Sequence, residues 1–102
     1  GKADIITDGK RVMHIRNGCP ERSDITGSGC MCTALVGAFV GAHPEDPFGA
    51  SAAAMLSMGI AGERAWRSYG HQGLGHFHMG ILDELGRMSA SVMEAEGKYD
   101  IL

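Results

Sequence analysis

The sequence lacks the features that mark membrane, secreted or nucleic-acid-binding proteins. It has no run of Lys or Arg, and 9 basic against 12 acidic residues give a net charge of −3. We therefore expect neither nucleic acid nor an anionic membrane as a partner. The longest weakly polar runs, 30–42 and 49–62, are shorter than the roughly 18 residues that span a bilayer. No signal peptide is evident, and three cysteines cannot all pair with one another, which favours reduced thiols in the cytoplasm.

Aromatic residues are also scarce, at 6% of the chain, whereas glycine supplies 16 of 102 residues. Few large side chains are therefore present to fill a hydrophobic core formed by this chain alone. Small residues dominate the apolar segments 34–42 and 50–54, which suits helices that pack closely against another surface. The hydrophobic share of 44% is nevertheless that of a globular chain. We expect residues 1–102 to form one portion of a larger single domain whose N-terminal portion is absent.

The chain should open with a β-hairpin. Residues 3–7 and 11–15 are short runs of β-type composition, and Asp8-Gly9 between them is a strong hairpin signal. An isolated hairpin is marginally stable in water, so it should belong to a larger sheet. Helical segments follow it, and this order is typical of the closing section of an α/β domain.

Three main helices are predicted after the hairpin. Apolar residues recur at spacings of three and four from residue 29 to about 43, and again from 47 to 70, where Asp46 is the expected N-cap. A third amphipathic pattern runs over residues 77–88. Capping-box spacing at Ser91 suggests a last short turn.

The segment with the most chemical information is Gly27-Ser28-Gly29-Cys30, directly before a predicted helix. The backbone N–H groups at a helix N-terminus are unsatisfied and attract anions, and glycine allows a phosphate to approach closely. The same field favours the thiolate form of Cys30, as a general base or nucleophile. An ordinary helix entry with a buried, inert cysteine is the alternative. The segment is neither a P-loop nor a dinucleotide-binding motif.

Several motifs, in order and with their spacing intact, resemble one family. They are Asp4–Gly9, Ile25–Met31, Gly59–Glu63 and Phe77–Leu85. Together they are similar to the C-terminal part of the hydroxyethylthiazole kinases, which have a ribokinase-like fold. The resemblance implies an α/β fold and ATP-dependent phosphorylation of the hydroxyethyl group of a methylthiazole in thiamine biosynthesis and salvage.

The resemblance also implies residue roles. Cys30 would be the general base toward the substrate hydroxyl, and Gly27 would lie at the thiazole. Gly27, Ser28 and Gly29 would form the anion hole for the transferred phosphoryl group, although the family usually has Thr where Ser28 stands. The acidic residues around Mg²⁺ would belong to the missing N-terminal portion, so no metal site is expected in this segment. The family forms homotrimers with active sites at subunit boundaries, and the chain alone should be inactive.

Three other functions stay open on the residues alone. Cys30 could be a covalent nucleophile in a hydrolase, activated by His14 or a later histidine. The Ala- and Gly-rich helices could instead dock on a partner as a non-catalytic fragment. A related kinase of the same fold could act on another small alcohol.

Other side chains favour structural roles. His71, His76 and His78 do not have zinc-site spacing and are expected to cap or to lie at the surface. Trp66 and Tyr69 should pack at the end of the second helix. Four methionines at helical spacing are expected in the core, and four acidic residues on solvated helix faces: Met55, Met58, Met79 and Met88, then Asp83, Glu84, Glu94 and Glu96.

Overall fold

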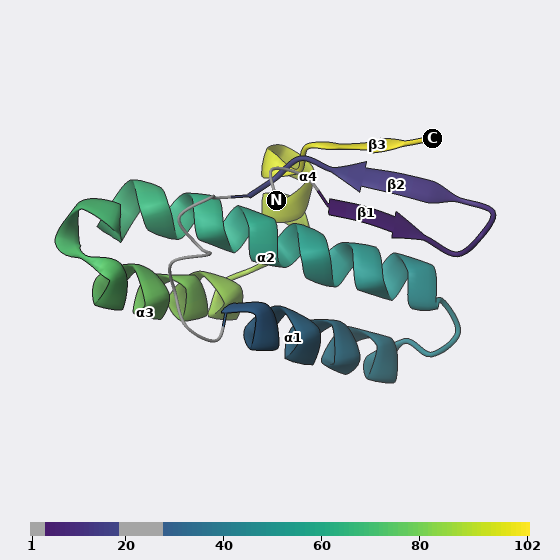
Figure 1. Ribbon diagram of the computed structural model, residues 1–102, viewed down its shortest axis with the longest axis horizontal. Coiled ribbons are helices and arrows are strands. Elements are labelled where there is room, and N and C mark those ends of the chain that lie inside the picture. The colour runs from purple at the N-terminus through teal and green to yellow at the C-terminus, as the bar shows by residue number, and fades with distance from the viewer. Residues whose placement is uncertain (1–3, 19–27) are drawn as a thin grey trace.

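A computed structural model describes residues 4–18 and 28–102, with the backbone alone for residues 4 and 28–30. Figure 1 shows three layers. A three-stranded antiparallel sheet and the short helix α4 (Ala90–Glu96) lie on one side of the long helix α2 (Pro47–Tyr69). Helices α1 (Ser28–Ala42) and α3 (Leu74–Gly86) lie on the other side. Helix α2 is therefore the middle layer.

The predicted hairpin is confirmed as strands β1 (Asp4–Thr7) and β2 (Val12–Ile15). In the turn, Asp8 Oδ1 accepts hydrogen bonds from the backbone N–H groups of Lys10, at 2.9 Å, and Arg11, at 2.7 Å. These bonds, with the Arg11 bond the stronger, lower the pKa of Asp8 to about 2. Gly9 has a φ of +89°, which glycine adopts without strain. Local turn chemistry thus accounts for Asp8.

A third strand was not predicted. Strand β3 (Tyr99–Ile101) pairs antiparallel with β2, so the sheet order is β1-β2-β3. Backbone hydrogen bonds from Arg16 N to Lys98 O, at 2.7 Å, and from Leu102 N to Val12 O, at 2.8 Å, extend this pairing. The hairpin therefore gains a partner from the last residues of the chain.

The helices match the sequence pattern except at two starts. Asp46 caps α2 by accepting from Gly49 N at 3.1 Å, as predicted. Helix α3 begins at Leu74, nearly one turn before the predicted Phe77, and a 3₁₀ turn, η2 (Gly70–Gln72), precedes it. Helix α4 is capped by Ser89, so the predicted start at Ser91 is wrong.

The core consists of two clusters on opposite sides of α2. One joins Met58, Ala61 and Ala65 to Phe77 and Ile81 of α3. The other joins Leu56 and Ile60 to Ile15 of the sheet. Trp66 packs edge-on against Phe77, with ring centroids 5.2 Å apart, which confirms its predicted packing role. Small residues in α2 allow both neighbouring layers to come close.

Two predictions about side-chain environment are wrong. Met79 is 61% exposed and does not belong to the core, whereas Met58 is fully buried. Glu84 is only 7% exposed, because Arg64 Nε of α2 donates to its carboxylate at 2.7 Å. Arg64 also binds Glu96 of α4. Glu84 and Glu96 thus join three helices through one guanidinium, and they do not lie on solvated faces.

Gly59 is the point of closest approach between α2 and the chain that leaves β2. A Cβ at Gly59 would lie 2.6 Å from the backbone oxygen of Asn17. Gly37 in α1 is the opposite case, since a Cβ there would have no neighbour within 4 Å. Packing therefore requires glycine at position 59, whereas at position 37 an alanine would change only the helix propensity.

We predict that Glu84→Gln lowers the free energy of unfolding by about 1–3 kcal/mol, because Arg64 loses a nearly buried charged acceptor. Urea unfolding followed by circular dichroism measures this. Asp83→Asn, on the exposed side of the same helix, is the control and should change stability by less than about 0.5 kcal/mol. Equal effects of the two variants would contradict the structural role of Glu84.

We also predict that Gly59→Ala destabilises the chain by about 1–3 kcal/mol, because the methyl group must displace the Asn17 backbone. Gly37→Ala should stabilise it by about 0.5–1 kcal/mol through helix propensity alone. The same urea titration compares the two. A stabilising Gly59→Ala would show that this close approach is absent in solution.

Candidate functional site

The candidate site is the N-terminus of α1. Ser28, Gly29 and Cys30 are the first three residues of this helix, while Gly27 lies outside the described residues. In an α-helix the first N–H groups have no partner within the helix, and they carry a partial positive charge. The first turn of α1 contains no acidic residue that would neutralise this charge. Its backbone is therefore suited to an anion.

Apolar packing holds the beginning of α1 in place. Met31, Cys32 and Leu35 are half-buried and pack against the cluster that α2 forms with α3. Cys32 Sγ lies 3.1 Å from Met55 Sδ of α2. The start of the helix is therefore fixed against the middle layer of the molecule.

A polar cluster holds the chain that leaves β2 against α2. We call it the Asn17 cluster: the side chains of Asn17, Glu63 and Lys98, with the backbone of Gly18 and Glu96. Glu63 accepts hydrogen bonds from Asn17, Gly18 and Lys98. Burial acts to raise the pKa of Glu63, but the bonds from Lys98, Asn17 and Gly18 outweigh it and hold the pKa below its ordinary value. Glu63 is thus an ionised acceptor at neutral pH.

Sequence reasoning missed the role of this cluster. Asn17-Gly18 has the composition of a turn and belongs, like Glu63, to the segments that resemble the family, but neither feature predicts a contact between them. The hydrogen bond from Asn17 to Glu63 spans 46 residues of sequence, so no local spacing could show it. An acidic residue directly after the small apolar run 58–62 was the one available signal.

The histidines do not form a metal site in the part of the chain that the structure describes. His71 and His76 are exposed and His78 is half-buried. Within residues 5–18 and 31–102, whose side chains the structure describes, no three His, Cys, Asp or Glu side chains gather as metal ligands. His14 lies in the central strand, between its register partners Ile5 and Asp100.

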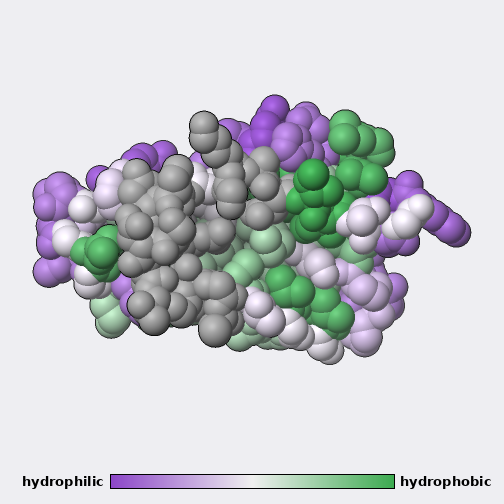
Figure 2. Space-filling model, viewed as in Figure 1, coloured by the Kyte–Doolittle hydropathy of each residue, from purple (hydrophilic) through white to green (hydrophobic). Residues whose placement is uncertain are grey.

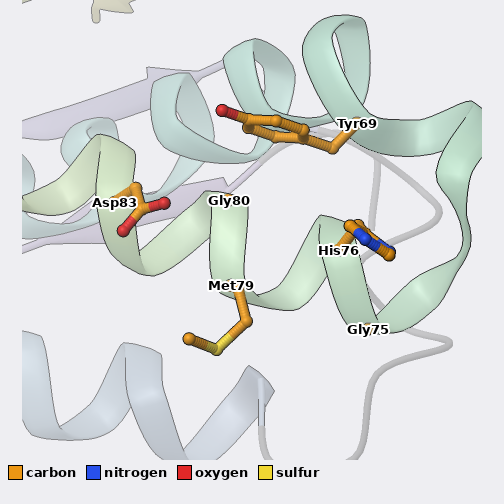
Figure 3. Close-up of a pocket in the computed structure, with 6 residues that line it drawn as sticks. All are labelled: Tyr69, Gly75, His76, Met79, Gly80 and Asp83. Atoms are coloured by element: carbon orange, nitrogen blue, oxygen red, sulfur yellow. The ribbon is translucent and has the colours of Figure 1, made fainter.

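Two surface hollows are lined by described residues outside the first turn of α1. One, of about 440 Å³, lies between the end of α2 and helix α3, and Figure 3 shows its six lining residues. The other, of about 410 Å³, lies near the connection from α1 to α2. Their lining residues are Tyr69, Gly75, His76, Met79, Gly80 and Asp83 in the first, and Phe39, His43, Glu45, Asp46, Gly49, Ala50, Ala53 and Met93 in the second.

None of the described helices is long and apolar enough to cross a membrane.

Comparison with known proteins identifies the family. The model of the hydroxyethylthiazole kinase family matches residues 1–91. The chain is 46% identical over 100 residues to a hydroxyethylthiazole kinase of Ruminiclostridium cellulolyticum, and the match covers 98% of this chain and 36% of that protein. It is 43% identical over 98 residues to the kinase of Clostridium beijerinckii, covering 96% of this chain and 35% of that protein.

The fold agrees with these matches. The structure of a hydroxyethylthiazole kinase protein from Pyrococcus horikoshii superposes with a TM-score of 0.91 at 33% identity. The superposition covers all of this chain and 39% of that one. The chain thus spans little more than a third of the length of these relatives and has the α/β fold of their C-terminal section. It belongs to the hydroxyethylthiazole kinase family.

Proposed function

We propose that this chain supplies the C-terminal section of an enzyme that phosphorylates the hydroxyethyl group of hydroxyethyl-methylthiazole with ATP, in thiamine biosynthesis and salvage. Family membership over residues 1–91 supports the reaction class. The observation that carries the site assignment is the start of α1 at Ser28, because it places Ser28, Gly29 and Cys30 in one helical turn.

In this proposal, Gly27, Ser28 and Gly29 form the anion hole. Their N–H groups stabilise the negative charge on the phosphoryl oxygens during transfer. Stabilisation of developing charge by fixed donors is usually the largest catalytic contribution, and phosphoryl transfer depends mainly on it and on positioning. The absence of an acidic side chain in the first turn supports this assignment. Gly27 would also contact the thiazole.

Cys30 is the proposed general base. Its thiolate accepts the proton of the substrate hydroxyl while the alcohol oxygen forms a bond to the γ-phosphorus of ATP. The bond from this phosphorus to the bridging oxygen breaks, and ADP leaves. The proton stays on the sulfur until it passes to solvent. A weak base suffices because most of the barrier is lowered by positioning and charge stabilisation.

Mg²⁺ belongs to the proposal for the complete enzyme, where it would neutralise charge on the ATP phosphates. Among the described side chains, no three His, Cys, Asp or Glu gather as metal ligands. We propose, on the family resemblance, that the ligands are acidic residues of the N-terminal portion, and no step here is assigned to the metal.

We further propose a cytoplasmic homotrimer. Exposed apolar side chains offer contact surface on the strands and on α3, and Figure 2 shows hydrophobic residues gathered over β1, β3 and α1. Light scattering of the assembled enzyme should give three times the chain mass. A monomer with full activity would contradict the trimer. The exposed residues include Ile5, Leu74, Met79, Leu82, Ile101 and Leu102.

The test of function uses a chimera in which the N-terminal part of the R. cellulolyticum relative precedes this chain. We predict ATP-dependent phosphorylation of hydroxyethylthiazole by the chimera and none by residues 1–102 alone. Cys30→Ser should lower kcat by about tenfold to a hundredfold, because a hydroxyl is a much weaker base than a thiolate. Coupled detection of ADP measures the rate.

Ala34→Ser is the matched control, since Ala34 lies one turn further along the same helix and is exposed. It should keep kcat within about twofold, because it introduces the same hydroxyl away from the proposed site and from the packed side of the helix. A Cys30→Ser chimera with unchanged kcat would refute the role of Cys30 as base. Turnover-dependent labelling of Cys30 without ATP would instead indicate a cysteine hydrolase.

A further inference from the structure

We propose that Glu63 is a positioning residue for phosphoryl transfer. Its carboxylate holds Asn17 and Gly18, the last described residues before the stretch 19–27 that leads to the start of α1. Glu63 would touch neither ATP nor the alcohol. This inference rests on the proposed function, because it concerns the placement of the proposed anion hole.

The carboxylate of Glu63 uses both of its oxygens. Oε1 accepts from Asn17 Nδ2 at 2.7 Å. Oε2 accepts from the backbone N–H of Gly18 at 3.2 Å and from Lys98 Nζ at 2.8 Å. Three donors converge on one carboxylate whose side chain is 20% exposed. Only a side chain that accepts hydrogen bonds on both of its terminal atoms, as a carboxylate does, can satisfy all three donors.

Asn17 is fixed because every polar atom of its amide is engaged. Besides the bond to Glu63, Nδ2 donates to the backbone oxygen of Glu96 at 2.9 Å. Its Oδ1 accepts from Lys98 N at 2.5 Å. The residue is 2% exposed, so water cannot replace a lost partner. A buried amide with a missing partner costs about 1–3 kcal/mol, and rotation of this amide is therefore disfavoured.

Helix α2 holds both ends of the stretch 19–27. At one end, Glu63 binds Asn17 and Gly18, and Gly59, one turn earlier, lets the Asn17 backbone lie against the helix. At the other end, Met31 of α1 packs on the cluster that contains Met58 and Ala61 of α2. Contacts that include α2 thus set the positions of both Gly18 and the first turn of α1. Loss of the Glu63 contacts would remove one of these two anchors.

Glu63 contributes more to this anchoring than Lys98 does. The Lys98 side chain is 55% exposed, and an exposed ion pair adds little stability because solvent screens it. The bonds from Asn17 and Gly18 are less exposed and join the two backbone segments directly. Removal of the lysine charge should therefore leave the anchor in place.

The test is Glu63→Gln in the chimera described above. Glutamine has one acceptor oxygen, and its NH₂ group must then face either Asn17 Nδ2 or the Gly18 and Lys98 donors. We expect kcat to fall by about tenfold or more, with KM for ATP and for the thiazole changed by less than about threefold, because positioning acts on the transition state. Amide hydrogen exchange at Gly18 should accelerate by about tenfold.

Two variants serve as controls. Lys98→Met removes the exposed ion pair and keeps the other donors of the Asn17 cluster, so kcat should stay within about twofold. Asp46→Ala removes the N-cap at the start of α2, away from the Asn17 cluster, so it loses stability but should also leave kcat within about twofold. All assays are run at least 15 degrees below the lowest unfolding midpoint, at about the same folded fraction for each variant.

The outcomes distinguish failure of the positioning role of Glu63 from failure of the proposed kinase function. A fall in kcat only for Glu63→Gln, with faster exchange at Gly18, supports positioning. Unchanged kcat or unchanged exchange overturns it, as does an equal fall in kcat for Asp46→Ala. An inactive chimera without any substitution would instead count against the proposed function of the chain.

Discussion

The structure depends on a helix that packs on both of its faces. Helix α2 contacts the sheet through Leu56 and Ile60, and it contacts α1 and α3 through Met58, Ala61 and Ala65. A helix buried on two sides cannot be strongly amphipathic, and its side chains must be small where layers come close. This explains why a chain with 6% aromatic residues still forms a core. Small side chains let the neighbouring layers approach α2 closely, so large side chains are not needed to fill the space between them.

The polar groups follow from the same constraint. Charged residues of α2 can lie only at the edges of its buried faces. Glu63 and Arg64 are adjacent residues at such an edge, and they bind different partners. Glu63 binds the chain that leaves β2, and Arg64 binds Glu84 and Glu96. Each group is paired, as desolvated charges must be. The pairs also link elements that are far apart in sequence. Through them, α2 is bonded to the chain after β2, to α3 and to α4.

Local signals in the sequence predicted most of the elements and fewer of the contacts. Asp8-Gly9 and Asp46-Pro47 fixed the hairpin and the start of α2, because turns and caps are made within a few residues. Strand β3 was missed because it has three residues and pairs with β2 from the far end of the chain. Glu84 was assigned to solvent because its partner lies 20 residues away. The start of α1 was predicted within one residue, whereas no local pattern linked Asn17 to Glu63.

The N-terminus of α1 is specified by local sequence, whereas its placement depends on long-range contacts, and the proposed chemistry needs both. A helix N-terminus is an anion-binding element that a short stretch of sequence can specify, but its use in phosphoryl transfer depends on its position in the fold. Placement comes from long-range contacts: packing of Met31 on α2 at one end and the hydrogen bonds of Glu63 at the other. The proposed thiolate base is weak, and it is sufficient only where placement is accurate. The residues that hold the backbone should therefore affect the rate as much as those that touch the substrate.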